Sequence, residues 1–350
     1  MSAATPARAD APGAARTRAL RPRSAAGALV LLGVVMAVAL VAAVAIGAAG
    51  LPLREVVAAL AGAGDDTTRA IVRDLRLPRA LLAAMTGGAL ALAGAVFQAL
   101  LRNPLAEPYV LGVSGGAAVG AVAAIVLGIA ALSPWVVPAA ALAGALAAIA
   151  IVFRIAAAAG RMLDTRVLLL AGVIVGAFFN AVILLLLTFA EAESFRSAVF
   201  WMMGSLSGAS WSTAALLAVY LLPAGVLLLG LARPLNLLAV GEETALHLGV
   251  RVERVKLVAY FVASLLVAAS VAACGVIGFI GLIIPHALRL AWGSDHRFLL
   301  PASLLAGAAF LLVADTAART LAAPAELPVG VITALIGVPV FVLLLARRRV

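Results

Sequence analysis

Long uncharged stretches, separated by short clusters of charged residues, dominate the hydrophobic pattern of this chain. A helix needs about 20 apolar residues to cross the hydrocarbon core of a bilayer, which is ~30 Å thick. Such stretches predict membrane-spanning helices over residues 24–53, 80–101, 167–190, 197–232, 298–318 and 327–346, and two more within residues 108–153, divided near Ser133 and Pro134. The pattern therefore indicates an all-α, polytopic membrane protein whose spans are the fold.

Residues 257–288 form a further uncharged stretch of ambiguous length. As one helix, with a rise of 1.5 Å per residue, it would be about 48 Å long, too long for one span and short for two. The distribution of positive charge favours two short spans that turn near Cys274 and Gly275, which makes ten in all. With ten spans, 18 of the 25 lysine and arginine residues lie on the side that holds both chain ends. The positive-inside rule then predicts that the N and C termini are cytoplasmic.

The composition excludes several other classes of protein. Hydrophobic residues make up 65% of the chain and charged residues 11%, whereas soluble domains carry about 25% charged residues. One cysteine and three scattered histidines allow no internal disulfide and predict no metal site. The net charge of +10 gathers on one predicted side of the membrane, so we expect no nucleic-acid partner. Residues 1–23 predict a disordered, basic cytoplasmic tail, followed by a permease domain over residues 24–350.

One short segment, residues 233–256, reads like soluble protein and is predicted to be a cytoplasmic loop. Residues 241–248 predict a helix of two turns, with Glu242 and Glu243 in the first turn, where the helix dipole favours negative charge. Gly249 stands where a left-handed C-terminal cap is expected. Because this helix carries apolar residues that no span needs, we expect it to bind a soluble partner. These apolar residues include Val240, Leu246 and Leu248.

The chain lacks the motifs of an energy-converting enzyme. It has no G-x-x-x-x-G-K-[ST] phosphate loop, since its only lysine, Lys256, follows a valine. It also lacks the G-x-S-x-G and H-E-x-x-H motifs. Asp315 is the one acid within a predicted span, and it stands four residues before Arg319, at the spacing of a helical ion pair. We therefore expect the energy source for any transport to be another polypeptide.

Small residues at helical spacing predict close contacts between spans. Gly116 and Gly120 form one such series, and Gly172 and Gly176 form another. Asn180 continues the second series, and a carboxamide in the middle of a span requires a polar partner or water. We predict that the face carrying Gly172, Gly176 and Asn180 borders an aqueous translocation path.

Seven sequence blocks between residues 75 and 345 resemble the FecCD-type permeases, the membrane subunits of ABC importers for iron chelates, haem and vitamin B12. The blocks are L-R-L-P-R from Leu75, R-N-P-L-A-E-P-Y-V-L-G from Arg102, F-W-M-M-G-S-L from Phe200, G-E-E-T-A-L-H-L-G-V from Gly241, G-F-I-G-L-I-I-P-H-A-L-R from Gly278, S-D-H-R from Ser294 and E-L-P-V-G from Glu326. Each block alone is weak, but seven in order are specific.

The resemblance implies a type II ABC importer permease with ten helices per subunit, in a bacterial cytoplasmic (inner) membrane. It implies alternating-access import of a ferric siderophore, haem or cobalamin by two permease subunits, expected to be a homodimer. Two cytoplasmic ATPases would bind the ATP and magnesium, and a periplasmic or lipoprotein substrate-binding protein would deliver the cargo. The chain itself is then expected to be a transport subunit rather than an enzyme, and to hold no cofactor.

The resemblance also implies roles for individual residues. The predicted ATPase-coupling residues are Gly241, Glu242, Glu243, Ala245, Leu248 and Gly249. The residues expected to dock the binding protein outside are Arg76, Arg79 and Arg319. Asp164 and Thr165 match the family's cytoplasmic gate, although Asp164 departs from the pair of small polar residues found there.

Two alternatives remain open. One is a secondary carrier or channel with its own driving force, against which the scarcity of acids within the spans argues. The other is an intramembrane enzyme for lipid or isoprenoid substrates, which usually shows clustered Asp, His or Glu near one interface. Copurification of an ATPase would favour the importer over both.

Overall fold

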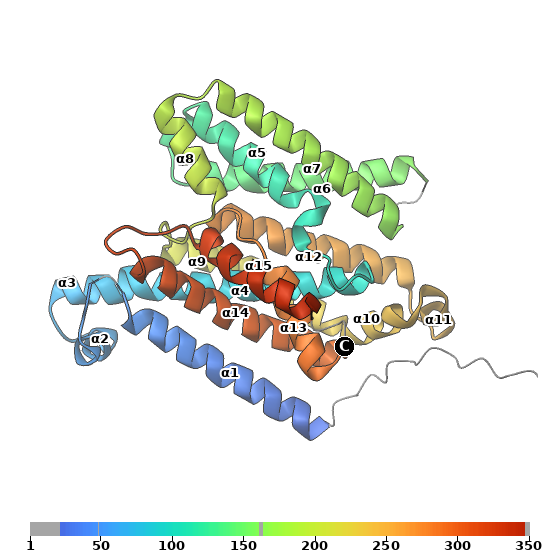
Figure 1. Ribbon diagram of the computed structural model, residues 1–350, viewed down its shortest axis with the longest axis horizontal. Coiled ribbons are helices and arrows are strands. Elements are labelled where there is room, and N and C mark those ends of the chain that lie inside the picture. Colours follow the sequence, from blue (N-terminus) through green and yellow to red (C-terminus); the bar gives the residue numbers. More distant parts are fainter. Residues whose placement is uncertain (1–21, 48, 161–163, 347–350) are drawn as a thin grey trace, which may run out of the picture.

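The computed structural model describes residues 22–47, 49–160 and 164–346, and this part of the chain consists of helices and loops (Figure 1). The α-helices are α1 (Pro22–Ala45), α2 (Leu53–Leu60), α3 (Asp66–Arg69), α4 (Leu77–Leu100), α5 (Val113–Val126), α6 (Val136–Ala158), α7 (Thr165–Thr188), α8 (Ala192–Met202), α9 (Trp211–Gly230), α10 (Ala232–Val240), α11 (Glu242–His247), α12 (Val252–Cys274), α13 (Ile280–Trp292), α14 (His296–Thr320) and α15 (Val329–Ala346). A π-helical stretch, Ala70–Arg76, joins α3 to α4. The predicted tail over residues 1–23 lies outside the described residues, except that residues 22 and 23 begin α1.

The prediction of an all-helical, polytopic membrane protein is confirmed. Seven helices of the described chain are long and apolar enough to cross a membrane, and the shorter apolar helices over 113–126, 280–292 and 329–344 occupy the other predicted spans. The uncharged stretch over 257–288 is divided as expected, because α12 ends at Cys274 and α13 begins at Ile280. Each predicted span therefore contains an apolar helix, and three of these helices are short.

The core is built around α4, whose residues 86–101 are all buried. Small residues let neighbouring helices approach it closely: a Cβ added to Gly87 would lie 2.3 Å from the Gly307 carbonyl oxygen of α14. The predicted small-residue contact of Gly116 is also confirmed, since a Cβ there would lie 2.3 Å from the Gly144 carbonyl oxygen of α6. Helices α5 to α8 form a second layer, which packs against α12 through α5 and α6 (Figure 1).

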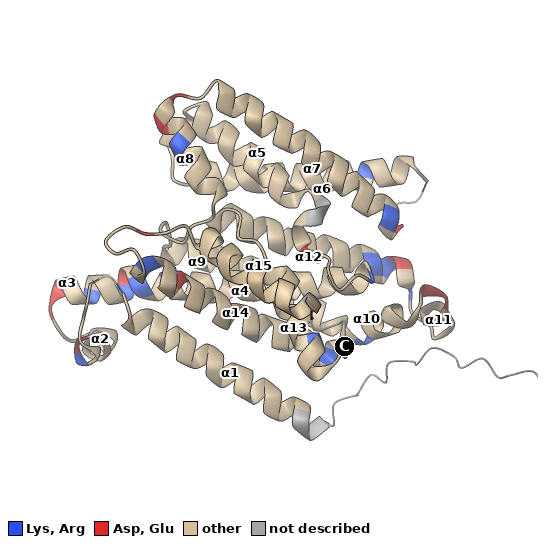
Figure 2. Ribbon diagram, in the orientation of Figure 1, with Lys and Arg blue, Asp and Glu red and all other residues tan. Residues whose placement is uncertain are grey.

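Charged residues gather at the two ends of the molecule and leave the middle of the long helices uncharged (Figure 2). We call these the α11 end, where α11 and the first residues of α7 and α12 lie, and the α3 end, where α3 and the start of α4 lie. Helix α1 starts, and α15 finishes, at the α11 end (Figure 1). Both ends of the described chain are therefore on one side of the helical bundle.

Candidate functional site

The short helix predicted around Gly241 is present as α11, Glu242–His247. It ends as the sequence predicts, because Gly249 adopts a left-handed backbone conformation with φ of 82°. The Val250 amide donates to the Ala245 carbonyl at 2.9 Å, and the Gly249 amide donates to the Leu246 carbonyl at 2.9 Å. These bonds satisfy carbonyls that the end of a helix would otherwise leave without partners.

The two faces of α11 differ sharply. Ala245 is fully buried and so anchors the helix against its neighbours. By contrast, Val240 at the end of α10, Leu246 within α11 and Leu248 directly after it are 74%, 58% and 62% exposed. Apolar residues exposed together at the tip of a protein mark an interaction surface. We call Val240, Leu246 and Leu248 the coupling patch.

The adjacent acids Glu242 and Glu243, which the sequence could not tell apart, have different surroundings. Lys256 Nζ of α12 lies 3.2 Å from Glu242 Oε1, and Arg102 Nη2, just beyond α4, lies 3.3 Å from the same oxygen. Glu243 is exposed. Glu242 therefore ties α11 to the ends of α4 and α12, whereas Glu243 faces outward.

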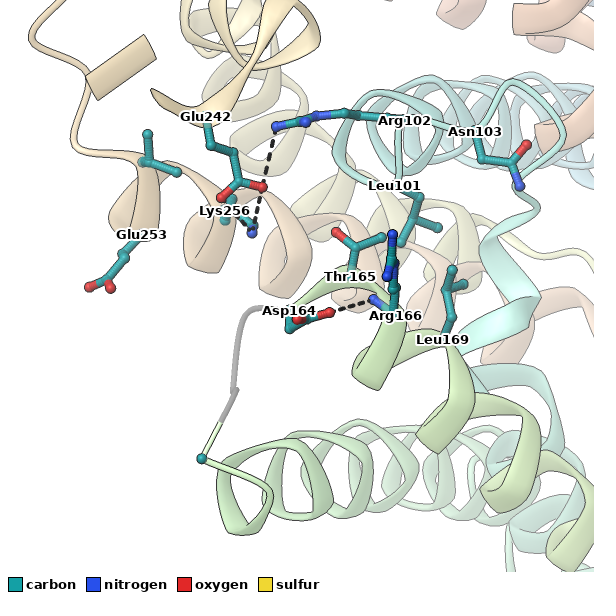
Figure 3. Close-up of a pocket in the computed structure, with 12 residues that line it drawn as sticks. Leu101, Arg102, Asn103, Asp164, Thr165, Arg166, Leu169, Glu242, Glu253 and Lys256 are labelled. Carbon is teal, nitrogen blue, oxygen red and sulfur yellow. Dashed lines mark hydrogen bonds and ion pairs between the residues drawn. The ribbon is translucent and has the colours of Figure 1, made fainter. Parts of the chain in front are cut away.

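A cavity of about 860 Å³ opens beside this ion-pair cluster (Figure 3). Arg102 and Lys256 point toward the Glu242 carboxylate on one wall, and the first residues of α7 form another wall (Figure 3). The predicted gate residues Asp164 and Thr165 lie on that second wall. Residues predicted separately for coupling and for gating thus line one cavity at the α11 end.

The two gate residues fix the start of α7. Asp164 Oδ1 accepts hydrogen bonds from the Arg166 amide at 2.9 Å and the Val167 amide at 3.4 Å, as an N-terminal capping residue does. The Thr165 hydroxyl donates to the Leu100 carbonyl at the end of α4, at 3.4 Å. The contact between α7 and α4 at this level therefore includes one long hydrogen bond.

A second polar cluster joins α10 to α14 at the same end of the molecule. Asn236 Nδ2 donates to Asp295 Oδ1 at 2.7 Å, and the His296 amide donates to Asn236 Oδ1 at 2.8 Å. Hydrogen bonds from Arg297, and then from Asn236, hold the pKa of Asp295 below its usual range. The S-D-H-R block therefore connects the segment before α11 to a long helix of the core.

At the α3 end, the three arginines predicted to dock a partner are held by contacts within the chain. Arg76 donates to the Val44 and Ala45 carbonyls at the end of α1, at 3.1 and 2.8 Å. Arg319 donates to the Ala43 carbonyl at 2.9 Å. These two arginines therefore supply donors to the last carbonyls of α1.

The third arginine, Arg79, lies in an ion-pair network. Its Nη2 is 2.9 Å from Asp315 Oδ1, and its Nη1 is 2.9 Å from Glu326 Oε2. Asp315 also pairs with Arg319 at 3.0 Å, which confirms the predicted i,i+4 pair. Arg79 and Arg319 line a cavity of about 260 Å³ at this end together with Arg76 and Glu326. The docking role of the arginines stays a prediction.

The predicted path residues of α7 follow one face of the helix but differ in exposure. Gly172 is buried and packs near Gly112, whose added Cβ would lie 3.4 Å from the Gly172 carbonyl oxygen. Gly176 is half-buried and Asn180 is exposed. The exposed side around Asn180 is otherwise apolar and includes Val173 and Leu184. Asn180 therefore stands alone as a polar group on a surface of the single chain.

Sequence reasoning missed three side chains that hold the break between α12 and α13. The Glu107 carboxylate accepts a hydrogen bond from the Phe279 amide at 2.9 Å. The Tyr109 hydroxyl donates to the Ile277 carbonyl at 2.7 Å. Gln98 Nε2 donates to the Gly281 carbonyl at 3.3 Å. This carbonyl has no helical partner, because residue 285, four positions later, is a proline and has no amide hydrogen.

Gln98 is buried, whereas Glu107 and Tyr109 are half-buried. Gly281 packs against Gly94, since a Cβ on Gly94 would lie 2.0 Å from the Gly281 carbonyl oxygen. Gly94 stands six residues before the end of α4, about 9 Å along the helix axis. Burial raises the pKa of Glu107 above its ordinary value. The acidic residue within the R-N-P-L-A-E-P-Y-V-L-G block was the signal in the sequence.

Among the described residues, no group of three His, Cys, Asp or Glu side chains is arranged to hold a metal ion. The site consists of the exposed coupling patch at α11, two polar clusters and a cavity. The polar clusters connect α10 and α11 to the ends of α4, α12 and α14, and the cavity lies between the ends of α4 and α12 and the start of α7.

Comparison with known proteins identifies the family. The model of the FecCD transport family matches residues 34–347. The vitamin B12 import system permease protein BtuC of Citrobacter koseri is 44% identical over 278 residues, 79% of this chain and 83% of that protein. The hemin transport system permease protein HmuU of Yersinia pestis is 42% identical over 285 residues, with the same coverage of both chains.

A solved structure shares the fold. It is described as an inward-facing conformation of a putative metal-chelate type ABC transporter, with 34% sequence identity and a TM-score of 0.82. The match covers 93% of this chain and 100% of that one. The chain therefore belongs to the FecCD transport family, as a multi-pass ABC transporter permease of the cytoplasmic membrane that has a transport rather than a catalytic role.

Proposed function

We propose that this chain is the membrane-spanning subunit of a type II ABC importer that moves a metal chelate into the cytoplasm by alternating access. The observation that carries the proposal is the similarity over nearly the whole chain to a metal-chelate type transporter, together with relatives named for vitamin B12 and hemin. The proposed cargo is accordingly cobalamin, haem or a ferric siderophore.

The proposed topology has ten spans, with the α11 end and both termini in the cytoplasm. Two observations support it. Both ends of the described chain lie at the α11 end (Figure 1), and with ten spans 18 of the 25 lysine and arginine residues, those of the chain tails included, fall on the side that holds the chain ends. The positive-inside rule assigns such an end to the cytoplasm. The coupling patch then faces the compartment that contains ATP.

The proposed assembly contains two permease subunits, two ATPases at the coupling patches and a binding protein at the α3 end. ATP and magnesium bind the ATPases, and the permease holds no cofactor. In this assembly the exposed side of α7 around Asn180 faces a path shared with the second copy. The path changes access when packed helices move as rigid bodies between two arrangements.

Transport in a defined system tests the proposal. The chain would be purified with its ATPases, reconstituted into liposomes with the binding protein, and supplied separately with cyanocobalamin, haemin and a ferric siderophore. We expect uptake of one of the three to require ATP hydrolysis. Uptake driven by a proton gradient without ATP would instead support a secondary carrier and contradict the proposal.

Removing the charge of Glu326 is expected to strengthen docking of the binding protein by about fivefold, the effect of an exposed ion pair worth ~1 kcal/mol. Glu326 is 44% exposed, whereas Asp315, the other partner of Arg79, is 1% exposed. A carboxylate on the binding protein therefore competes with Glu326 rather than with Asp315. Binding of the Glu326→Gln variant in nanodiscs would be measured at low and high salt, since salt weakens such contacts.

The control for this measurement is Glu55→Gln, which removes the same charge from an exposed residue of α2 at the same end. It is expected to change docking by less than twofold. Equal affinities for the wild-type protein and Glu326→Gln at low salt would show that Arg79 does not receive the partner's carboxylate.

A further inference from the structure

Both cations that pair with Glu242 occupy positions that are unfavourable for them in isolation. Lys256 has 7% of its side chain exposed, and a buried ammonium group is stable only with a partner. It also lies within five residues of the start of α12, at the end of a helix that disfavours positive charge. The placement of this one lysine therefore depends on the Glu242 carboxylate, 3.2 and 3.3 Å from its Nζ.

Arg102 reaches the same carboxylate from an unfavourable backbone. Its φ is 46°, a left-handed conformation that favours glycine and is uncommon for a residue with a long side chain. The position caps α4, since the Asn103 amide donates to the Gln98 carbonyl at 3.2 Å. A strained backbone of this kind is retained where the side chain has a function that a glycine at the same position could not perform. Here the side chain contacts Glu242 at 3.3 Å.

We infer that Lys256 and Arg102 are positioning residues that make α11 move together with the ends of α4 and α12 when the ATPases change shape. The inference rests on the proposed function, because it assumes that ATPases bind the coupling patch. Helix α11 packs against α10 and α12. Its contact with the end of α4 is the ion pair between Glu242 and Arg102. Without the two cations, α11 would follow the ATPase while α4 stayed behind.

The cavity beside the cluster shows what this movement changes. Its walls are the ends of α4 and α12 on one side and Asp164 and Thr165 on the other. The Thr165 hydroxyl crosses to α4 by a hydrogen bond of 3.4 Å, which is longer than the 3.2 Å contact of Lys256 with Glu242. Movement of α11 with α4 and α12 therefore alters the distance to α7 and opens or closes the cytoplasmic mouth.

Uptake per ATP hydrolysed is the measurement that tests this inference. The complete complex in liposomes would be compared with Lys256→Met, which keeps an apolar stem, and with Glu242→Gln, using the cargo that the wild-type complex transports. We expect both variants to bind the ATPases and hydrolyse ATP, while uptake per ATP falls about tenfold, within the usual range of coupling between two sites. The double variant should lose no more than Glu242→Gln alone, because that change already breaks the contact with Lys256.

Glu193→Gln is the control, since it removes the same charge from an exposed residue in the first turn of another helix, α8, which lies away from α11 (Figure 1). Its uptake per ATP should stay within about twofold of the wild type. Unchanged coupling in Glu242→Gln, or an equal loss in Glu193→Gln, would overturn the inference. If Lys256→Met does not assemble, Glu242→Gln decides alone, because its side chain is 44% exposed and tolerates the change. A wild-type complex without ATP-dependent uptake would contradict the proposed function instead.

Discussion

Replacing Asp315 with alanine is expected to destabilise the folded protein by about 3–5 kcal/mol, the cost of breaking a buried ion pair by removing one partner. Asp315 is 1% exposed and pairs with both Arg79 and Arg319, at 2.9 and 3.0 Å. Its removal leaves the buried guanidinium group of Arg319 and the half-buried one of Arg79 near each other without the carboxylate between them. Thermal unfolding of the detergent-solubilised chain would measure the loss.

Two variants separate the charge of Asp315 from its shape. Asp315→Asn keeps the size of the side chain but removes its charge, and it should destabilise nearly as much as alanine. Glu326→Gln removes the exposed partner of Arg79 and should cost at most ~1 kcal/mol. If Asp315→Ala lowers the unfolding temperature no more than Glu326→Gln does, the buried network does not stabilise the contact between α4 and α14.

Introducing charge into the coupling patch is expected to weaken ATPase binding by at least about 30-fold, since interface hot spots contribute 2 kcal/mol or more. The double variant Leu246→Glu and Leu248→Glu places two carboxylates where both leucines are more than half exposed. The fold should be retained, because neither side chain is buried. Affinity of the purified ATPase for the chain in nanodiscs is the direct measurement.

Leu60→Glu is the control for this result, because Leu60 is also an exposed leucine of a short helix, but at the α3 end. ATPase affinity should be unchanged in that variant. Unchanged affinity in the Leu246 and Leu248 double variant would show that the ATPases bind elsewhere and would remove the main support for the coupling role of α11.

Elements with a local cause were predictable from the sequence. The end of α11 before Gly249 follows from the need for a left-handed residue. The pair of Asp315 and Arg319 follows from helical spacing. In each case the relevant residues are neighbours in the chain, so spacing alone determines the contact.

Contacts between distant segments were not predictable in the same way. Glu242 and Glu243 are adjacent acids in the first turn of α11, so the local sequence does not distinguish them. They differ because Arg102, which follows α4, and Lys256 of α12 both pair with Glu242. The buried position of Arg76 depends likewise on the end of α1, thirty residues earlier. Spacing predicts which residues share a helix face, but tertiary packing decides which of them meet a partner.

The burial of Cys274 makes this chain suitable for labelling with thiol-reactive probes. It is the one cysteine of the sequence, its side chain is buried, and its sulfur lies 3.3 Å from the Thr86 hydroxyl. A spin label or fluorophore therefore attaches selectively to any cysteine introduced at an exposed site, without replacement of the native residue. Labels at position 254, exposed near the start of α12, and at position 60 would report the separation of the two membrane faces of the protein through each ATP cycle.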